Sequence, residues 1–431
     1  MEAKIIFKSL EQVDNQITYN QKRDFLEEIV NEFDDSLKKV LFIPPDFTRF
    51  HSNGGEITQI LFELINEDCQ KKILPALGTH SPLSDEEISV MFGKIPKKHF
   101  IVHDWRNEVV KVGTIPSEFI KELSEDKLNY SINVEINKEF VKENYDLIIS
   151  IGQVVPHEVA GMANGNKNVL VGVGGRDMIN KSHFLSACYG MERLIGKTDN
   201  PVRHLFTYAE SIFLKEIPLL YILTVVSANN SGNVNLKGLY TSNDNRSFEK
   251  AAKLSQKINL TFLKDPISKI VVYLDPKEFK STWLGNKAIY RTRMALEDNG
   301  DLIILAPGLK QFGEDDTIDQ IIRRYGYRTS TEIIAAVKKN EDLQQNLSAA
   351  AHLIHGSSEN RFNITYCPGH IKKNEIEGIN YQYSDLFEAL NVYNPTKLIE
   401  GFNRLPDKEE IFFIRNPAMG LWTVEEKFMQ M

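Results

Sequence analysis

The chain has few cysteines and no excess of positive charge, and both absences exclude classes of protein. Its three cysteines, Cys69, Cys188 and Cys367, are odd in number and far apart, which is typical of reduced thiols rather than of a disulfide framework. None has metal-site spacing with a second cysteine. The formal net charge of −8 argues against a general nucleic-acid binder.

Long apolar runs are also missing. The longest, residues 217–226, is strand-like, contains Pro218 and is shorter than the roughly 20 residues that span a bilayer. The N-terminal residues lack the apolar core of a signal peptide. We therefore expect a cytoplasmic protein with no membrane partner.

Several catalytic motifs do not occur in the sequence. HExxH, Walker A, GxSxG and a CxxC pair are absent, which excludes most zinc proteases, P-loop NTPases, α/β-hydrolases and thioredoxin-like enzymes. Hydrophobic residues make up 42% and charged residues 26% of the chain, as in an ordinary globular protein. A length of 431 residues favours two domains.

Strand-like runs alternate with helix-like ones, which is typical of mainly parallel sheets covered by helices. In the first half, strands are predicted at residues 39–44, 72–77, 99–103 and 145–152, and helices at 57–66 and after the N-cap Ser84. The second half has predicted strands at 268–274 and 301–306, with a helix near 286–298 between them.

This pattern predicts an α/β protein with two α/β domains. The domains would be residues 1–255 and 268–431. The division would lie between residues 250 and 268, after a helix that starts at Phe248.

Two loops that follow predicted strands carry candidate site residues. In Asp46-Phe47-Thr48-Arg49 the aspartate can fix a turn or hold a ribose hydroxyl, and the arginine can bind a carboxylate or phosphate. An Asx turn beside a surface arginine is the simpler alternative. In Gly78-Thr79-His80, the histidine is well placed as a general base, but an exposed loop histidine fits as well. His103 is expected to be structural.

The segment from His157 to Lys167 gives the strongest indication of an enzyme. It follows a predicted strand and combines an imidazole with an amine in a loop rich in glycine and asparagine. Glu158 would hold the imidazole of His157 in one tautomer. Residues 169–173 are predicted to be a strand before a glycine turn, and His183 is either a metal ligand or a packed core histidine.

The second domain offers fewer candidates. Trp283 and Lys287 are four residues apart, so on one helix they would share a face and close over an anionic substrate. A solvated helix with a buried tryptophan is the alternative. His352 and His355 have half of a metal-site spacing but no third partner.

Taken together, these residues resemble the lactate racemase family. The resemblance extends from about residue 40 to about residue 310, and it rests on the loops at 46–49, 78–80 and 156–161 together with Lys167, His183 and Lys287. The steps of ten residues from His157 to Lys167 and sixteen to His183 make the combination specific. Enzymes of this family use a nickel-pincer nucleotide (pyridinium-3-thioamide-5-thiocarboxylic acid mononucleotide) that holds nickel.

The resemblance implies an active site in the cleft between the two domains, with residues 1–255 binding the cofactor and carrying the catalysis and residues 268–431 closing over the substrate. It also implies a role for each residue. Lys167 would bind the cofactor covalently through a thioamide, and His183 would complete the square-planar nickel site. His80 and His157 would be the acid–base pair on opposite faces of the substrate. The remaining residues would contact the ligands: Arg49, Lys287 and Trp283 the substrate, and Asp46 and Thr48 the cofactor.

The implied activity is racemisation or epimerisation of a 2-hydroxy acid by transient hydride transfer from C2 to the cofactor, which cofactor-biosynthesis enzymes would supply. Three features depart from the lactate-specific pattern: Ser81 in place of arginine, the stretch 164–166 before the lysine, and Trp283-Leu284 in place of Tyr-Gln. We therefore expect a 2-hydroxy acid other than lactate, with an aldonate epimerised at C2 as a candidate. The alternatives are an NAD-dependent 2-hydroxyacid dehydrogenase and a non-catalytic nickel- or cofactor-binding protein.

Overall fold

The computed structural model describes residues 6–228 and 234–430, which fall into two compact units. The described part of the first unit contains residues 6–182, 196–228 and 234–258, and that of the second contains residues 183–195 and 259–430. The segment 183–195 therefore groups with the second unit, although the chain returns to the first unit immediately after it.

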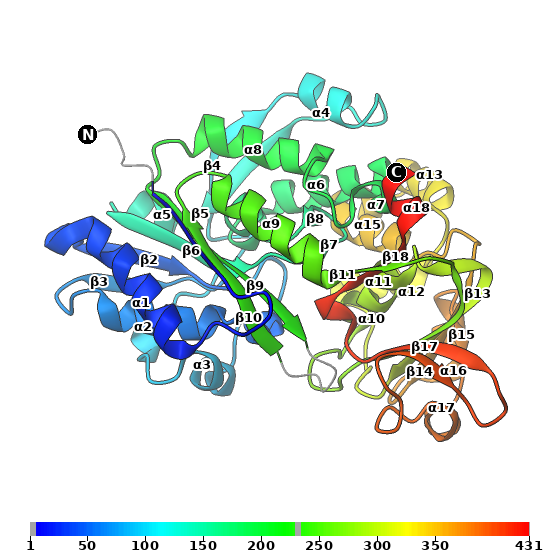
Figure 1. Cartoon of the computed structure of the whole chain (residues 1–431). Coiled ribbons are helices and arrows are strands. Elements are labelled where there is room, and N and C mark those ends of the chain that lie inside the picture. The colour runs from blue at the N-terminus through cyan, green and yellow to red at the C-terminus, as the bar shows by residue number, and fades with distance from the viewer. Residues whose placement is uncertain (1–5, 229–233, 431) are drawn as a thin grey trace. The chain divides into compact units, whose positions relative to one another are not determined.

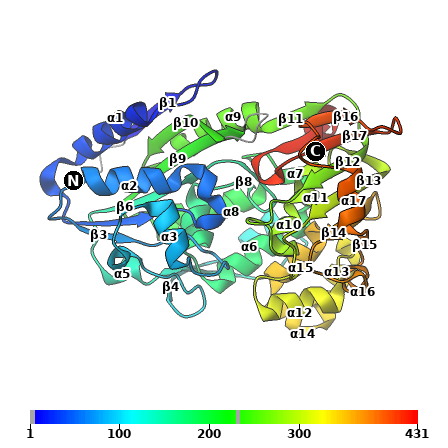
Figure 2. The ribbon, with the colours of Figure 1, turned by 90° about the horizontal axis from the view of Figure 1, so that it is seen from below.

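A six-stranded sheet forms the centre of the first unit (Figures 1 and 2). Its strands in spatial order are β1 (Phe7–Glu11), β10 (Val234–Ser242), β9 (Leu219–Ala228), β6 (Leu147–Gln153), β2 (Lys39–Ile43) and β3 (Gln70–Ile73). The four strands from β9 to β3 are parallel neighbours, while β1 and β10 pair antiparallel. All seven residues of β6 are buried, as expected of a central strand covered on both faces.

The connections of the first unit are mostly helical. They are α1 (Tyr19–Val30), η1 (Asn31–Ser36), η2 (Phe47–Ser52), α2 (Gly54–Leu64), α3 (Asp85–Phe92), η3 (Lys97–His99), α4 (Ser117–Leu123), α5 (Glu139–Lys142), η4 (Asn168–Gly172), α6 (Arg176–Tyr189), α8 (Pro201–Phe213) and α9 (Arg246–Asn259), of which α6 continues into the second unit. Two small sheets are added, β4 (Val109–Ile115) with β5 (Ile132–Asn137) and β7 (Pro156–His157) with β8 (Gly161–Met162).

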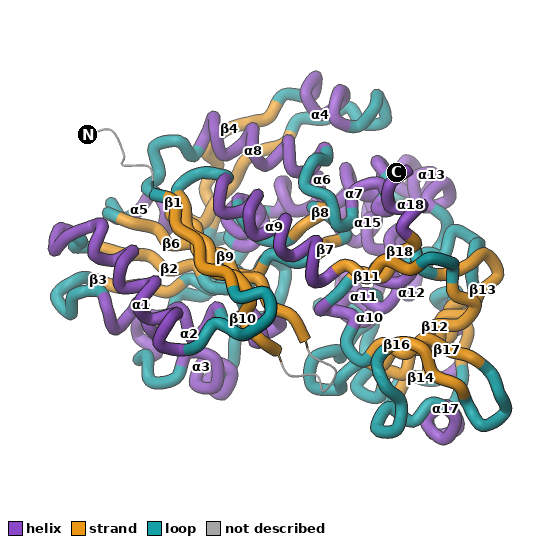
Figure 3. Tube along the Cα trace, in the orientation of Figure 1, coloured by secondary structure: helices purple, strands orange, loops and turns teal. Residues whose placement is uncertain are grey.

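The second unit has its own six-stranded sheet, whose strands are orange in Figure 3. In spatial order they are β15 (Gln382–Tyr383), β14 (Asn363–Pro368), β13 (Leu296–Ala306), β12 (Ile267–Tyr273), β17 (Glu410–Ile414) and β16 (Gly401–Arg404), and only the last pair is antiparallel. A parallel pair, β11 (Leu260–Leu263) with β18 (Leu421–Val424), completes the strands. The predicted class, two α/β domains with mainly parallel sheets, is confirmed.

The helices of the second unit are short. They are α7 (Met191–Leu194), α10 (Thr282–Gly285), α11 (Lys287–Thr292), α12 (Asp316–Tyr325), α13 (Ser330–Lys339), α14 (Glu341–Gln345), α15 (Leu347–His355), α16 (Lys373–Gly378), α17 (Leu386–Val392), η5 (Pro417–Met419) and α18 (Glu425–Gln430). A search of every helix in the described ranges finds none with the length and apolar character needed to cross a membrane.

Local sequence features mark the starts of several of these helices. The predicted N-cap Ser84 forms a capping box with Glu87 at the start of α3. Asn200 caps α8 and is followed by Pro201 at the first helical position, where proline is tolerated. The polar stretch before Phe248 leads into α9, as expected, although the helix begins two residues earlier at Arg246.

Three local predictions were wrong. Residues 99–103 form no strand, because only Phe100 bridges to Ile73 at the end of β3 and the ladder does not continue. Residues 169–173 were predicted as a strand, but 168–172 form the π-helix η4. Every residue of η4 is buried, so its apolar run carries no periodicity that separates a strand from a helix. The helix expected at 286–298 ends at Thr292, and β13 begins at Leu296.

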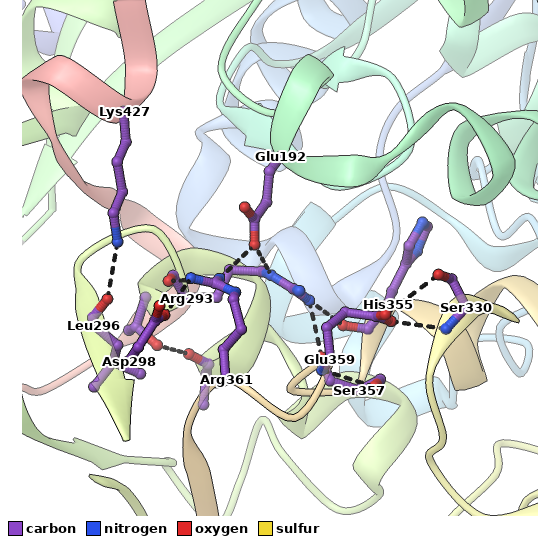
Figure 4. A network of polar contacts seen from close by, with 12 residues as sticks. Glu192, Arg293, Leu296, Asp298, Ser330, His355, Ser357, Glu359, Arg361 and Lys427 are labelled. Atoms are coloured by element: carbon purple, nitrogen blue, oxygen red, sulfur yellow. Dashed lines mark hydrogen bonds and ion pairs between the residues drawn. The ribbon is translucent and has the colours of Figure 1, made fainter. Parts of the chain in front are cut away.

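A network around Glu192 attaches segment 183–195 to the rest of the second unit (Figure 4). One oxygen of Glu192 accepts hydrogen bonds from Nε of Arg293 at 2.6 Å and Nη2 of Arg361 at 2.7 Å. Arg293 also donates to the carbonyls of His355 and Ser357 at 3.2 and 3.0 Å. Burial raises the pKa of Glu192, but the two guanidinium groups outweigh this effect and hold the pKa below 4.5.

We predict that Glu192→Gln destabilises the second unit by about 2 kcal/mol at pH 7, because it removes the charge that pairs with the buried guanidinium of Arg293 and the partly buried one of Arg361. The folded-state pKa of Glu192 is lowered, so its ionised carboxylate contributes fully to the free energy of unfolding above pH 4.5. That contribution is lost as the pH falls through the lowered pKa. Denaturant unfolding at pH 7 and pH 3 measures the difference in unfolding free energy between wild type and variant. This difference should be smaller at pH 3.

The matched control is Glu377→Gln, because Glu377 is 53% exposed and its ion pair with Lys373 spans 3.8 Å. It should leave the unfolding free energy nearly unchanged. Equal losses in the two variants would contradict the role assigned to Glu192.

Candidate active site

Three loops of the first unit follow neighbouring parallel strands. β2 lies between β3 and β6 in the sheet, so the segments after these strands leave from the same edge. The pairing of β2 with β3 continues past the strands as a parallel bridge between Pro45 and Ala76. The loops that carry residues 46–49 and 78–80 are therefore neighbours.

Asp46 and His80 form a direct pair between these two loops. Nδ1 of His80 is 2.5 Å from Oδ2 of Asp46, and the hydroxyl of Thr48 donates to Oδ1 of the same carboxylate at 2.6 Å. Gly78 adopts a φ of +56°, and its N–H donates to the carbonyl of Gly172 at 2.8 Å, which fixes the turn before His80.

The Asp46 carboxylate orients the imidazole of His80. Burial raises the pKa of Asp46, but the charge and hydrogen bond of His80, with Thr48 and Arg49, outweigh burial and lower it below its usual value. An ionised carboxylate can only accept, so Nδ1 of His80 carries the proton. The neutral ring then presents a lone pair at Nε2, the form that a general base requires.

His157 has the opposite arrangement. Its side chain is buried, and Nδ1 accepts the backbone N–H of Val159 at 3.0 Å and that of Ala160 at 3.4 Å. An acceptor nitrogen has no proton, so the neutral ring carries its proton at Nε2. Nε2 lies 3.8 Å from Oε1 of Glu158. His157 is therefore a hydrogen-bond donor at Nε2 in this arrangement.

Lys167 ends the same loop, immediately before η4. Burial, together with the positive charges of Arg49 and Arg203, lowers the pKa of its amine to about 8, while Glu158 and Asp46 act in the opposite direction. These interactions bring the 46–49 loop and the 156–167 loop within electrostatic reach of one amine. An amine with this pKa is a far better nucleophile near neutral pH than an ordinary lysine.

Two buried polar groups near these loops lack a hydrogen-bond partner among the described residues. They are Nη1 of Arg49 and the side-chain amide of Gln153, which is 3% exposed. Gln153 is in register with Thr224, whose hydroxyl donates to the carbonyl of Ser52 in η2, so both side chains face η2. Buried polar groups without partners are costly, so these atoms suit a polar ligand.

Sequence reasoning missed three residues of this region, namely Gln153, Asn168 and Arg203. The amide of Asn168 donates to the carbonyl of Ile43 and to the hydroxyl of Ser150, which ties η4 to the ends of β2 and β6. Asn168 and Gln153 lie close to the predicted motifs, but no local pattern marks their side chains as buried. Arg203 is 36 residues beyond Lys167 and has no sequence signal at all.

The other predicted site residues belong to the second unit. His183 lies on α6, where the chain passes from the first unit to the second, and is half-buried. Among the described residues, no three histidine, cysteine, aspartate or glutamate side chains form a group that could hold a metal ion. Trp283 lies on α10, and Lys287 begins α11 with its amine 5.6 Å from the ring centre of Phe279.

Trp283 packs on a polar aromatic cluster of the second unit. Its ring centre is 4.3 Å from that of His352, whose two nitrogens are bonded to the hydroxyls of Tyr290 at 2.7 Å and Tyr327 at 2.9 Å. His103 in the first unit is likewise structural, with bonds to Gly174 and Asn137 and a pKa lowered to about 4 by burial. The two histidines therefore support packing.

Comparison with known proteins agrees with this geometry. Residues 6–192 match the family of lactate racemase N-terminal domains. The match covers the N-terminal part of the chain. The resemblance predicted from the sequence is thereby confirmed. Over 198 residues the chain is 29% identical to the lactate racemase of Thermoanaerobacterium thermosaccharolyticum, an alignment that covers 44% of this chain and 42% of that enzyme.

Solved structures show the same fold over nearly the whole chain. A protein from Thermotoga maritima aligns with a TM-score of 0.83 at 24% identity and covers 96% of this chain and 100% of its own. The lactate racemase apoprotein of T. thermosaccharolyticum aligns with a TM-score of 0.69 at 18% identity, covering 95% and 93%. At these identities the likeness establishes the fold.

We predict that a small acylating reagent modifies Lys167 ahead of other lysines in the apoprotein. With a pKa of about 8, half of its amine is unprotonated at pH 8, against roughly 0.4% of an ordinary lysine. Peptide mass spectrometry across pH 6 to 11 should give a labelling profile for Lys167 with its midpoint near pH 8. The exposed Lys250 supplies the reference rate in the same sample, and a Lys167 profile that follows Lys250 would contradict the prediction.

Proposed function

We propose that this protein racemises or epimerises a 2-hydroxy acid, with His80 and His157 as its acid–base residues and a nickel-pincer nucleotide attached through Lys167. The observation that carries the proposal is the pair of imidazoles with opposite proton positions in the unit that contains a low-pKa lysine. Oxidation of the substrate at C2 needs a base for its hydroxyl proton and a hydrogen-bond donor for its oxygen, and His80 and His157 match these two requirements.

The residues present fit the cofactor. Lys167 offers a nucleophilic amine for the thioamide, while Arg49 and Gln153 offer buried donors without a hydrogen-bond partner in the described part of the chain. His183 would supply the imidazole ligand to nickel, and one protein ligand suffices when the nucleotide itself holds the metal. When bound, the group would supply an acceptor for the C2 hydrogen of the substrate as hydride. Asp46 and Thr48 would lie against the nucleotide.

Proton movement follows from the hydrogen bonds. His80 accepts the substrate hydroxyl proton at Nε2, and Asp46 stabilises the imidazolium that results. His157 holds the oxygen of the substrate through Nε2–H. To act as base toward the other stereoisomer, His157 must move its proton to Nδ1, which breaks the bond from the Val159 amide. The two histidines that would act in the two directions of the reaction thus start with their protons on different ring nitrogens.

The substrate's carboxylate would be held by Arg49 and Lys287. Nη1 of Arg49 is buried without an acceptor among the described residues, and a carboxylate supplies acceptor oxygens in the geometry that a guanidinium prefers. Lys287 is 7% exposed, so its ammonium also gains from a negative ligand. Trp283, stacked on His352, would form an apolar wall. The substrate would be a 2-hydroxy acid other than lactate, with aldonates as candidates.

The first test is intact mass with nickel analysis on protein produced together with the cofactor-biosynthesis enzymes. Wild type should carry a mass adduct and bound nickel, and Lys167→Ala should carry neither. Lys250→Ala, a lysine removed from an exposed position of the same unit, should behave as wild type. Wild-type protein without adduct or nickel, from cells that load a control racemase, would rule out the cofactor assignment.

With loaded enzyme, chiral chromatography of 2-hydroxy acids and aldonates measures turnover. We predict that His80→Asn and His157→Asn each lower kcat/KM by about 10²–10⁴-fold. Asp46→Asn should lower it by about 10–100-fold, because His80 stays in place but loses the charge that orients it. In each histidine variant the mass adduct should persist. Turnover with an accumulating pool of free NADH would instead favour a dehydrogenase.

A further inference from the structure

The loop that carries His157 and Lys167 has little regular structure of its own. Its hairpin, β7 with β8, has two residues in each strand. Three of its residues adopt positive φ values, Gly161 at 73°, Asn164 at 63° and Gly165 at 63°. Asparagine adopts the left-handed backbone at a higher cost than glycine, so contacts from the surrounding structure help to hold the loop in this shape.

The guanidinium of Arg203 supplies that support. Arg203 lies on α8, is 4% exposed, and donates from Nε to the carbonyl of Ala160 at 3.2 Å. Nη2 donates to the carbonyls of Met162 and Asn164, the latter at 2.9 Å, and Nη1 donates to the side-chain oxygen of Asn166 at 3.0 Å. Four alternate residues of the loop thus bond to one planar group.

Neighbouring side chains hold Arg203 and the end of the loop in turn. The ring of Phe248 lies 4.0 Å from Cζ of the guanidinium, a cation–π distance. The amide of Asn166 donates to Glu210 at 3.1 Å, and the hydroxyl of Tyr221 donates to the other oxygen of Glu210. Burial raises the pKa of both Glu210 and Tyr221, so this pair keeps its shared proton.

A buried arginine is a costly choice for packing alone. Burial lowers the pKa of Arg203 to about 9, and Glu210 offsets only part of this effect. An apolar side chain of similar size would avoid the cost of the charge, but it would remove a donor from four buried loop oxygens. The Ala160 carbonyl would keep its bonds from Met162 and Asn200, whereas the Met162 and Asn164 carbonyls would lose their bonds from Arg203. The planar fork satisfies several carbonyls at fixed angles, which a lysine ammonium does not reproduce.

We propose that Arg203 is a positioning residue that presets the 156–167 loop, and with it His157 and Lys167, before the cofactor arrives. The guanidinium bonds to residues between those two side chains, so it fixes their spacing. It touches neither the substrate nor the reacting atoms in this role. The link from the loop to the cofactor rests on the proposed function, whereas the ordering of the loop does not.

The test is hydrogen–deuterium exchange of the apoprotein. In Arg203→Lys the amides of residues 160–167 should exchange at least tenfold faster than in wild type, while those of β2 and β6 stay unchanged. Arg203→Met, which removes the charge as well, should show at least the same increase. If Arg203→Met does not fold, the exchange rates of the loop amides in Arg203→Lys test the proposal. Unchanged exchange in the loop, or an equal increase throughout the first unit, would overturn the proposal.

Arg246→Lys is the matched control. Arg246 belongs to the same unit, pairs with Asp244 at 2.7 Å with a side chain 47% exposed, and has no bond to the loop. It should leave loop exchange as in wild type.

Co-production with the cofactor-biosynthesis enzymes tests the link to Lys167. The adduct should accumulate at least tenfold more slowly in Arg203→Lys than in Arg246→Lys. Equal accumulation would refute the part of the proposal that concerns Lys167. If the wild type gains no adduct, the proposed function is wrong. Hydrogen–deuterium exchange of the loop amides still tests the positioning role of Arg203.

Discussion

The parallel pairing of β2 with β3 and β6 is the constraint on which the candidate site depends. It makes the segments after these strands leave from one edge of the sheet, so residues far apart in sequence become neighbours. The bond between Asp46 and His80 is the direct result, and Asn168 adds a bridge from η4 to the strand ends. A change of register in β2 would separate all of these groups.

Buried charge gives the site its chemical character. Burial destabilises the charged groups in the loops of the first unit. Ion pairs and hydrogen bonds offset this destabilisation. Asp46 stays ionised because His80 and Thr48 bond to it, and Lys167 responds to burial by losing affinity for its proton. Arg203 keeps its charge among the carbonyls of the loop. An acid–base pair and a nucleophilic amine result from the same low-polarity surroundings.

The second unit supplies rigid supports. Glu192 ties the segment that contains the end of α6 to Arg293 and Arg361, so His183 lies at the start of an anchored segment. Trp283 rests on His352, which two tyrosine hydroxyls hold at both nitrogens. In the proposed reaction, a metal ligand and the apolar wall of the substrate site would both need such fixed positions.

The sequence by itself determined the α/β class, most strands, the capped start of α3 and the residue types of the loops, because periodicity and capping are local. The family resemblance also came from motifs within single loops. Only the tertiary structure decided that residues 168–172 form a helix, because a fully buried apolar run has no distinguishing period. The Asp46–His80 pair and the bonds of Arg203 likewise depend on chain segments that meet through sheet pairing and packing, which no local pattern encodes.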